Sequence, residues 1–334
     1  MANRLAVVFG GSGFIGRHVV QHLARQGWRV RVAVRDAEGA AFLKPLGEVG
    51  QVVPVHANVG NDASVATMVQ GADLVVNLVG VLVSRGKRSF KALHEEAAAR
   101  VAKAAAAAGV SRLVHVSALG ASATSASAYA RSKAAGEEAV RAAFPTATIL
   151  RPSVVFGPED DFFNRFAALA TVSPVLPVFV TDGLRPRFCG KIPCGIDLFG
   201  SGGTKFQPVY VGDVAQAVLA AAERADALGK TFELGGPTVY SMKRILEMTL
   251  AASGRKRLIV PKPMIAAKLL AAVLQFLPKP PLTPDQVKLL AVDNVPDGTA
   301  PGLAALGITP TAAEVVLPTY LSRYINPYVH QQPV

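Results

Sequence analysis

The sequence predicts an α/β protein built on a doubly wound parallel sheet, with a smaller mixed lobe in its C-terminal half. Three observations support this fold class. Short β-branched runs alternate with helical patterns, a glycine-rich segment joins the first run to the first helical pattern, and the alternation weakens after Pro158. Near-continuous apolar strands separated by helices are typical of a sheet covered on both faces.

The individual elements follow from these patterns. Strands are expected at Leu5–Phe9, Arg29–Val34, Val52–Val55, Leu74–Leu78, Leu113–Ser117 and Thr148–Leu150. Helices are expected between them at Phe14–Gln26, Ala63–Gln70, Lys91–Ala108 and Tyr129–Ala143. We therefore expect a Rossmann-type core over residues 1–157 and a C-terminal lobe and interaction region over residues 158–334. The two are interleaved, because strand and helix patterns return around residues 205–236.

The composition is that of a folded protein with a basic surface. Of 334 residues, 51% are hydrophobic and 17% are charged, which excludes a disordered or fibrous chain. The mean hydropathy of +0.34 is high for a freely soluble enzyme and indicates a large contact surface with protein or membrane. A net charge of +12 favours phosphates, anionic lipid or acidic partners. We expect no nucleic-acid partner, because stacked-aromatic and zinc-finger patterns are missing.

The two cysteines, Cys189 and Cys194, are too few for a disulfide scaffold and indicate a reducing compartment. The sequence has no histidine between His115 and His330 to complete a ligand set. We therefore interpret the cysteines as loop thiols and expect no metal site.

The sequence also predicts that the chain does not cross a membrane. Met1 leads directly into the first strand, so we expect a chain that is not secreted and carries no organelle transit segment. The longest apolar helical stretch, Met264–Leu277, contains Lys268. It is shorter than the roughly 18–20 residues that span a bilayer.

The segment Gly10-Gly11-Ser12-Gly13-Phe14-Ile15-Gly16 follows the first strand directly and opens the first helix. Glycines at the first, fourth and seventh places allow a tight turn, close approach to a pyrophosphate and close helix packing. The helix start then offers amide donors and a partial positive charge to phosphates. This placement predicts a dinucleotide site; the alternative is a glycine turn that binds nothing.

The cofactor is selected at the end of the second strand, where an acidic residue would accept a hydrogen bond from the ribose of NAD. This chain has Arg35 there, followed by Asp36. Arg35 would pair with a 2′-phosphate, and Arg17 could add a second charge, so NADPH is favoured. In the alternative interpretation, Arg35 is a solvated strand end and Asp36 turns inward.

Three further motifs resemble the atypical or extended branch of the short-chain dehydrogenase/reductase superfamily: Asn77-Leu-Val-Gly80, Tyr129-Ala-Arg-Ser-Lys133 and Val209-Tyr-Val-Gly-Asp-Val-Ala215. The spacing of Tyr129 and Lys133 places them on one helix face. In active members of that superfamily, the lysine lowers the tyrosine pKa and holds the nicotinamide ribose, and the tyrosine exchanges a proton with the substrate. In a member without activity, the pair could still bind the ribose; a plain exposed helix face is the alternative.

Blocks in the second half narrow the resemblance. They are Leu150–Asn164, Lys205–Asp213, Leu282–Leu290, Asp293–Val295, Leu306–Pro310 and Pro318–Leu321. Together they resemble the nucleotide-binding accessory subunits of respiratory complex I, NADH:ubiquinone oxidoreductase, over almost the whole chain from Leu5 to about Tyr324. The resemblance implies a subunit that holds NADPH far from the electron-transfer chain, in a structural or regulatory role. It implies docking near the junction of the peripheral and membrane arms, among other complex I subunits.

The resemblance and the composition together set an expected location. Without a transit segment, the chain resembles a bacterial subunit at the cytoplasmic face of the inner membrane, held there peripherally. Its basic character and the proline-framed segment Met264–Leu277 suit contact with anionic lipid.

The resemblance also assigns the cofactor site residue by residue. Gly10, Ser12, Gly13, Phe14, Ile15 and Gly16 would hold the pyrophosphate, Arg35 the 2′-phosphate with Arg17 as a second charge, and Asn58 and Val59 the adenine. Leu78, Val79, Gly80, Ser117, Tyr129, Lys133 and Pro152 would line the nicotinamide end.

The chain departs from the family pattern in two places. The segment from about Asp182 to Asp197 is longer than the usual loop, and it could contact a neighbouring subunit or be a solvated excursion. Where extended-branch enzymes carry a substrate-orienting serine, this chain has Leu119, which cannot form a side-chain hydrogen bond. Ser122, Ser125 or Ser127 could substitute.

Three functions therefore stand at this stage. The first is an NADPH-bound accessory subunit without catalysis of its own. The second is a free NADP-dependent reductase or epimerase, which would show turnover with a carbonyl substrate. The third is a redox sensor, whose affinity for a partner would differ between oxidised and reduced cofactor.

Overall fold

The fold is described from a computed structural model, which covers residues 4–86, 88–182, 185–189, 192–278 and 280–325. Contacts divide the chain into two compact units. The first comprises Met1–Pro152, Val211–Gly235 and Pro296–Pro310. The second comprises Ser153–Tyr210, Gly236–Val295 and Thr311–Val334. The expected assignment of functions to residues 1–157 and 158–334 stays a prediction.

The first unit is built on one seven-stranded sheet with the order β13-β6-β5-β4-β1-β2-β3. Its strands are β1 (Leu5–Phe9), β2 (Arg29–Val34), β3 (Val52–His56), β4 (Leu74–Asn77), β5 (Arg112–Val116), β6 (Thr148–Pro152) and β13 (Thr231–Leu234). Every neighbouring pair is parallel. The predicted Rossmann-type sheet is therefore confirmed, and β13 extends it from the region where the sequence patterns return.

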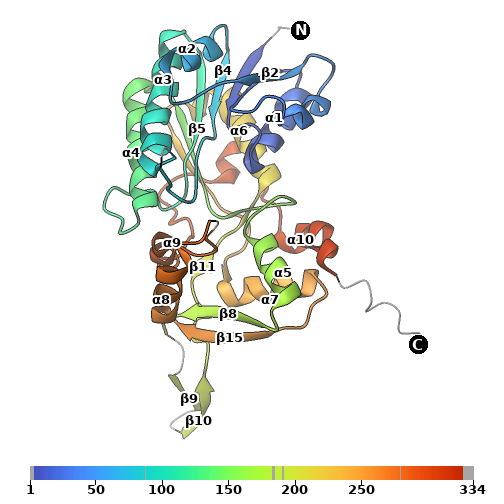
Figure 1. Ribbon diagram of the computed structural model, residues 1–334, viewed down its shortest axis with the longest axis vertical. Helices are drawn as coiled ribbons and strands as arrows, with labels where there is room; N and C mark the ends of the chain where they lie inside the picture. The colour runs from blue at the N-terminus through green and yellow to red at the C-terminus, as the bar shows by residue number, and fades with distance from the viewer. Residues whose placement is uncertain (1–3, 87, 183–184, 190–191, 279, 326–334) are drawn as a thin grey trace, which may run out of the picture. The chain divides into compact units, whose positions relative to one another are not determined.

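Helices cover both faces of this sheet (Figure 1). They are α1 (Phe14–Arg25), α2 (Asp62–Val69), α3 (Ala97–Ala107), α4 (Ala128–Ala143) and α6 (Val211–Glu223). Helices α1 and α6 pack together on one face, and α2, α3 and α4 form a row on the other. The segment expected as one helix over Lys91–Ala108 begins as a π-helix, Lys91–Glu96, and continues as α3. Short 3₁₀ helices lie at Ala41–Leu46, Ala225–Ala227 and Leu303–Leu306.

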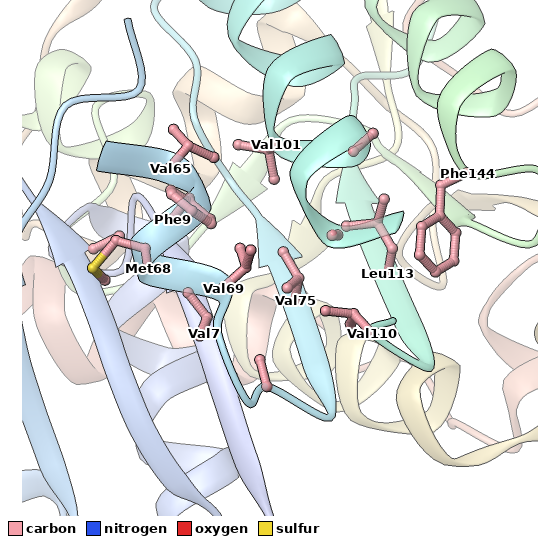
Figure 2. Packing of buried hydrophobic residues seen from close by; sticks show 14 of the residues in the cluster. Val7, Phe9, Val65, Met68, Val69, Val75, Val101, Val110, Leu113 and Phe144 are labelled. Atoms are coloured by element: carbon pink, nitrogen blue, oxygen red, sulfur yellow. The ribbon is translucent and has the colours of Figure 1, made fainter. Parts of the chain in front are cut away.

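One core of the first unit lies between the sheet and the row of α2, α3 and α4, and apolar side chains of α1 and α6, such as Val20 and Val214, are buried as well. Figure 2 shows Val7, Phe9 and Val75 of the sheet packed close to Val65 of α2 and Val101 of α3. All five are buried. Each such side chain contributes about 1.5–3 kcal/mol by leaving water, so packing fixes the strand ends that carry the candidate site.

The second unit has only short sheets. Its pairs are β7 (Val155–Phe156) with β12 (Val209–Tyr210), β8 (Val175–Val180) with β15 (Leu258–Pro263), β11 (Lys205–Phe206) with β14 (Tyr240–Ser241), and β9 (Arg185–Cys189) with β10 (Ile192–Asp197). Its helices are α5 (Phe163–Val172), α7 (Met242–Ala252), α8 (Met264–Leu274), α9 (Pro284–Leu289) and α10 (Ala313–Leu321), with a 3₁₀ turn at Ser322–Tyr324. Apolar side chains of α5, α7 and α10 form its main core.

The structure corrects the interpretation of the two cysteines and also concerns the expectation that the chain does not cross a membrane. Cys189 and Cys194 were expected in a loop, but they lie in the antiparallel hairpin of β9 and β10, which contains an irregularity between Pro193 and Gly195. The two strands pair with each other, which satisfies their backbone groups. Within the described part of the chain, we find no helix with the length and apolar character needed to span a bilayer.

Candidate functional site

The candidate site lies where the strand order of the parallel sheet reverses, between β1 and β4. From β1 the chain proceeds to β2 and β3 on one side, whereas β4, β5 and β6 lie on the other. In open α/β sheets, this switch point leaves a crevice at the carboxyl ends of the strands, where ligands bind. Gly10 follows β1 and Leu78 follows β4, and the Leu78 amide donates to the Phe9 carbonyl at 3.0 Å.

The glycine loop is shaped by the absence of side chains at specific places. Gly10 has a φ of +80°, and a Cβ there would lie 3.1 Å from the Leu78 carbonyl carbon. A Cβ at Gly16 would lie 2.3 Å from the Gly10 carbonyl oxygen, so the helix could not pack this close to the loop. Gly11 also leaves no room, since its Cβ would lie 2.4 Å from Val32 Cγ1. Sequence reasoning missed this packing role of Gly11.

Gly13 is less enclosed than Gly11 and Gly16, although a Cβ there would still make a tight contact. A Cβ at Gly13 would meet only the Gly10 carbonyl oxygen, at 3.3 Å. Gly13 is exposed and is the N-cap of α1, where no side chain caps the helix and no acidic residue occupies the first turn. Ser12 lies in the turn before it, and Phe14, Ile15 and Arg17 lie in the first turns of the helix. This helix start fits an external anion such as a pyrophosphate.

Arg35 lies just beyond the carboxyl end of β2 and is exposed. Its carbonyl accepts a hydrogen bond from His56 Nδ1 at 2.8 Å, which fixes the backbone at this point. Asp36 accepts a hydrogen bond from the Gly39 amide at 2.9 Å, so its carboxylate holds the following turn. The Arg17 guanidinium stacks over the Phe42 ring at 5.0 Å. This corner of the site is therefore cationic.

Asn58 and Val59 follow β3 at the same edge of the sheet. Asn58 is exposed, and its Oδ1 accepts from the Gly60 amide at 2.9 Å. Val59 packs against the core, and its carbonyl accepts from Arg100 Nη1 at 2.9 Å. The two residues form an ordered turn whose polar side faces solvent.

Tyr129 and Lys133 lie one turn apart on α4, near the carboxyl ends of β4 and β5. Helix α4 begins here because Ser127 caps it, accepting from the Ala130 amide. Lys133 Nζ is 3.5 Å from the Val116 carbonyl oxygen and 6.0 Å from the centre of the Tyr129 ring. A Cβ at Gly80 would lie 3.2 Å from the same ammonium. The structure thus brings together Gly80, Tyr129 and Lys133.

Burial shifts the pKa values of both groups. Loss of solvation lowers the pKa of Lys133 to about 8, with partial compensation from the Glu137 carboxylate. The same cause raises the pKa of Tyr129 to about 12. At neutral pH the lysine is therefore mainly charged and the tyrosine protonated, so Tyr129 is a proton donor in this state.

Ser117 and Pro152 complete the nicotinamide end. Ser117 follows β5 and is buried, and its Oγ has no hydrogen-bond partner among the described residues. Pro152 ends β6, and its carbonyl accepts from the Leu119 amide at 2.9 Å. A buried hydroxyl without a partner costs free energy, and a ligand at this edge would offset that cost. Ser117 therefore fits a bound cofactor.

The serines that could replace a substrate-orienting hydroxyl serve the local backbone. Ser122 Oγ lies 3.1 Å from Thr124 Oγ1, Ser125 accepts from the Ser127 amide at 3.2 Å, and Ser127 caps α4. Leu119 itself is half-buried. The site thus contains a Tyr–Lys pair and lacks a hydroxyl at the position where extended-branch enzymes place one.

Two buried histidines beside the pair were missed by sequence reasoning. His94 lies in the π-helix, and His115 lies on β5, where Asn77 Nδ2 donates to its Nδ1 at 3.2 Å. Burial and the Lys133 charge lower the pKa of each to about 3. The nearly continuous apolar run of β5 could have indicated that His115 is buried. No motif marked His94. Among the described residues, no group of His, Cys, Asp and Glu could hold a metal ion.

Comparisons with known proteins agree with this geometry. The model of the NAD dependent epimerase/dehydratase family matches residues 6–235. The chain is 33% identical to subunit 9 of the NADH dehydrogenase (ubiquinone) 1 alpha subcomplex from Mus musculus, over 93% of this chain and 78% of that protein. It is 35% identical to the Arabidopsis thaliana protein of the same name, over 92% and 74%.

Two further similarities concern reductases. Ceramide reductase of Caulobacter vibrioides is 39% identical over 177 residues, which is 53% of this chain and 54% of that protein. Among solved structures, an NADPH-dependent quinone oxidoreductase from Escherichia coli, complexed with NADPH, has a TM-score of 0.68 at 20% identity. That likeness covers 96% of this chain and 100% of the other, and it shows the fold alone.

Proposed function

Since the chain belongs to the NAD dependent epimerase/dehydratase family, and within it to the family of complex I alpha subcomplex subunit 9, we propose that it is an accessory subunit of respiratory complex I that holds NADPH. The observation that carries this proposal is identity of 33–35% over 92–93% of the chain. The family model ends at residue 235, whereas the similarity to these relatives also covers most of the second unit beyond that residue.

The residues of the first unit fit an NADPH molecule. Gly10–Gly16 and the uncapped start of α1 would bind the pyrophosphate, Arg35 with Arg17 the 2′-phosphate, and Asn58 with Val59 the adenine. Leu78 to Gly80, Ser117, Tyr129, Lys133 and Pro152 would surround the nicotinamide and its ribose. When bound, NADPH supplies a hydride at its nicotinamide ring. Asp36 already holds its own turn, which favours NADPH over NADH because its carboxylate is less free to bind the ribose.

A structural or regulatory role follows from linkage between binding and folding. A ligand that binds only the folded chain raises the free energy of unfolding with the logarithm of its concentration over Kd. Ser117 and Lys133 are buried polar groups whose cost a bound nucleotide would offset. NADPH would thereby set how much of the chain is competent to dock on the complex.

We also propose that the chain is peripheral to the cytoplasmic face of a bacterial inner membrane, with α8 against anionic lipid. Exposed apolar side chains of α8 and the turn after it are Ile265, Leu269, Leu270, Val273, Phe276 and Leu277. The small residues Ala267 and Ala271 face the protein instead. Between Met248 and Pro284 the sequence has lysines and arginines but no acidic residue. An apolar helix face in a basic segment suits the surface of an anionic bilayer.

Native gel electrophoresis of mildly solubilised membranes tests the main proposal, with the chain located by mass spectrometry. We expect migration in a large assembly that carries NADH dehydrogenase activity. Deletion of the gene that encodes the chain should reduce the amount of that assembly. Migration of the chain alone, with an unaltered assembly in the deletion strain, would refute the accessory-subunit proposal.

A free NADP-dependent reductase or epimerase is the second candidate. The Tyr129–Lys133 pair favours it, because a protonated phenol beside a buried ammonium can donate a proton to a carbonyl oxygen. The similarity to ceramide reductase over 53% of the chain points the same way. Steady NADPH consumption on adding carbonyl compounds to the purified chain would establish this candidate. No consumption is expected for an accessory subunit.

A further inference from the structure

His94 links the two segments that enclose the proposed nicotinamide end. It is buried in the π-helix Lys91–Glu96, a rare type of turn that often occurs at functional sites. The Val81 amide, in the loop after β4, donates to His94 Nε2 at 3.0 Å. On the other side of the ring, His94 Nδ1 lies 2.8 Å from Ser132 Oγ on α4. One imidazole therefore connects the loop to the helix that carries Tyr129 and Lys133.

The donor and the acceptor can be assigned for each hydrogen bond in the series from Val81 through His94 and Ser132 to Tyr129. Because the Val81 amide can only donate, Nε2 must accept, and the proton of the neutral ring is on Nδ1. Nδ1 then donates to Ser132 Oγ, and Ser132 donates onward to the Tyr129 carbonyl at 2.7 Å. A protonated ring would turn Nε2 into a second donor facing the Val81 amide. Burial and the nearby Lys133 charge keep the ring neutral by lowering the pKa of His94 to about 3.

Aromatic packing holds the ring in this orientation. The Phe90 ring stacks on His94 with centroids 5.3 Å apart, and Tyr129 meets the same imidazole edge-on at 5.4 Å. Helix α4 also comes unusually close, since a Cβ at Gly136 would lie 2.0 Å from the His94 carbonyl oxygen. The π-helix and α4 are thus packed backbone to backbone, and His94 cannot shift without moving one of them.

From these contacts we infer that His94 is a positioning residue, which clamps the loop of Leu78–Val81 to α4 and so sets the width of the nicotinamide end. This inference rests on the proposed binding of NADPH. The loop and α4 carry Leu78–Gly80, Tyr129 and Lys133, which are proposed to surround the nicotinamide ribose, and His94 is hydrogen-bonded to both segments. The adenosine contact at Arg35 lies on another strand end. The glycine loop meets the clamped segment at Leu78 and Val79, whereas His94 holds it at Val81, so we expect the pyrophosphate contacts to depend little on this clamp.

Two probes separate the clamp from a general effect on folding: NADPH, and 2′-phospho-ADP, which lacks both the nicotinamide ring and its ribose. In the variant His94→Leu both hydrogen bonds are lost, and we expect the Kd for NADPH to rise about tenfold or more. The Kd for 2′-phospho-ADP should change by less than about twofold. The emission of bound NADPH should also shift towards that of the free dinucleotide, because its nicotinamide is less enclosed.

Conservative variants cover the case in which His94→Leu does not fold. His94→Gln keeps one acceptor and one donor and should restore most of the NADPH affinity. Ser132→Ala breaks only the link to α4 and should weaken the binding of NADPH by about threefold, again without affecting the binding of 2′-phospho-ADP. Phe144→Leu, at the far end of α4, is the matched control: it loosens the same core and should leave the ratio of the two affinities unchanged.

The outcomes are distinct. A wild-type chain that binds neither probe would overturn the proposed NADPH function, and the clamp with it. A wild-type chain that binds both, with His94 variants that weaken both equally or neither, would overturn the clamp alone. Selective loss of NADPH affinity, rescued by His94→Gln, supports it.

Discussion

The two ends of the candidate cofactor site use different parts of the polypeptide: backbone groups at one end and polar side chains at the other. The phosphate end consists of backbone: Gly10 and Gly16 leave no room for side chains, and α1 begins at Gly13 without a cap. The nicotinamide end consists of buried polar side chains, among them Lys133, Ser117 and His115. The phosphate end has exposed amide groups that water can solvate when the ligand is absent. The nicotinamide end leaves Ser117 Oγ and His115 Nε2 without hydrogen-bond partners among the described residues.

This difference shows which part of the site lowers the free energy of unfolding of the ligand-free chain. Exposed amides at a helix start are solvated until a ligand replaces the water, so they cost little. A buried ammonium with one long hydrogen bond, and a buried hydroxyl without a partner, cost free energy whenever the ligand is absent. The nicotinamide end should therefore destabilise the free chain, and the phosphate end should not. Four substitutions test this contrast.

The largest effect is expected from Gly16→Val at the phosphate end. Its Cβ would lie 2.3 Å from the Gly10 carbonyl oxygen, so loop and helix must separate. We expect a loss of roughly 3 kcal/mol in the free energy of unfolding, measured by chemical denaturation, and no measurable NADPH binding. Gly13→Ala is the control, because its Cβ would meet the Gly10 carbonyl oxygen at 3.3 Å and no closer atom: the stability loss should be much smaller while NADPH affinity falls. Equal stability losses for the two variants would mean that the loop is strained throughout, against the contrast drawn above.

Arg35→Glu should have the next largest effect, and it should act on binding alone. Charge reversal beside a 2′-phosphate removes a charge-assisted hydrogen bond worth about 1.5–3 kcal/mol and adds repulsion. We expect the Kd for NADPH to rise about 100-fold by isothermal titration, with little change for NADH. Arg29→Glu, at the other end of the same strand, is exposed and should leave both affinities unchanged. A variant Arg35→Glu that still purifies with bound NADPH would refute the assignment.

Much of the first unit could be predicted because its strands are apolar on both faces. The expected bounds of Leu5–Phe9 and Arg29–Val34 agree with β1 and β2, since glycine or charged residues end each run abruptly. The second unit was not resolved into elements, because its strands are short and interrupted by proline. Strand β8 contains Pro177, and β15 contains Pro261, in pairs that form only through contacts distant in sequence.

The candidate site shows the same limit. The glycine loop could be recognised because its spacing is fixed by local backbone geometry. His94 and His115 could not, because their roles depend on which strands and helices become neighbours. His94 lies 38 residues from Ser132 in the sequence, and His115 lies 38 residues from Asn77. The hairpin of β9 and β10 was interpreted as a loop for a related reason: its pairing satisfies backbone groups without an apolar pattern.

A third substitution, Lys133→Met, tests the cost of the nicotinamide end. Burial lowers the pKa of Lys133 from 10.5 to about 8. Below pH 8 both folded and unfolded chains carry the proton and the desolvation cost is fully present; between pH 8 and 10.5 the unfolded chain binds more protons, so stability rises with pH. Lys133→Met should therefore stabilise the ligand-free chain by roughly 2 kcal/mol at pH 7, with a smaller gain at pH 9.5.

The same variant should bind NADPH at least about tenfold more weakly, since the ribose loses a charged donor. Lys103→Met, on the exposed side of α3, is the control and should change neither quantity. If Lys133→Met were less stable than the wild type at pH 7, the buried ammonium would stabilise the folded chain. It would then not be a destabilising group whose free-energy cost the ligand offsets.

The smallest effect on binding is expected from Leu119→Ser, which adds a hydroxyl where extended-branch enzymes carry one. The Leu119 amide already donates to the Pro152 carbonyl, so the backbone should keep its place and the Kd for NADPH should change by less than about twofold. If the nicotinamide end lacks only this hydroxyl, the variant should consume NADPH slowly with a reactive ortho-quinone, where the wild type does not. Leu119→Ala has the same packing loss without the hydroxyl and should stay inactive. Equal rates for the serine and alanine variants would show that this position does not limit chemistry. Turnover by the wild type itself would favour the reductase, because the Tyr129–Lys133 pair would then suffice to deliver a proton without a second hydroxyl.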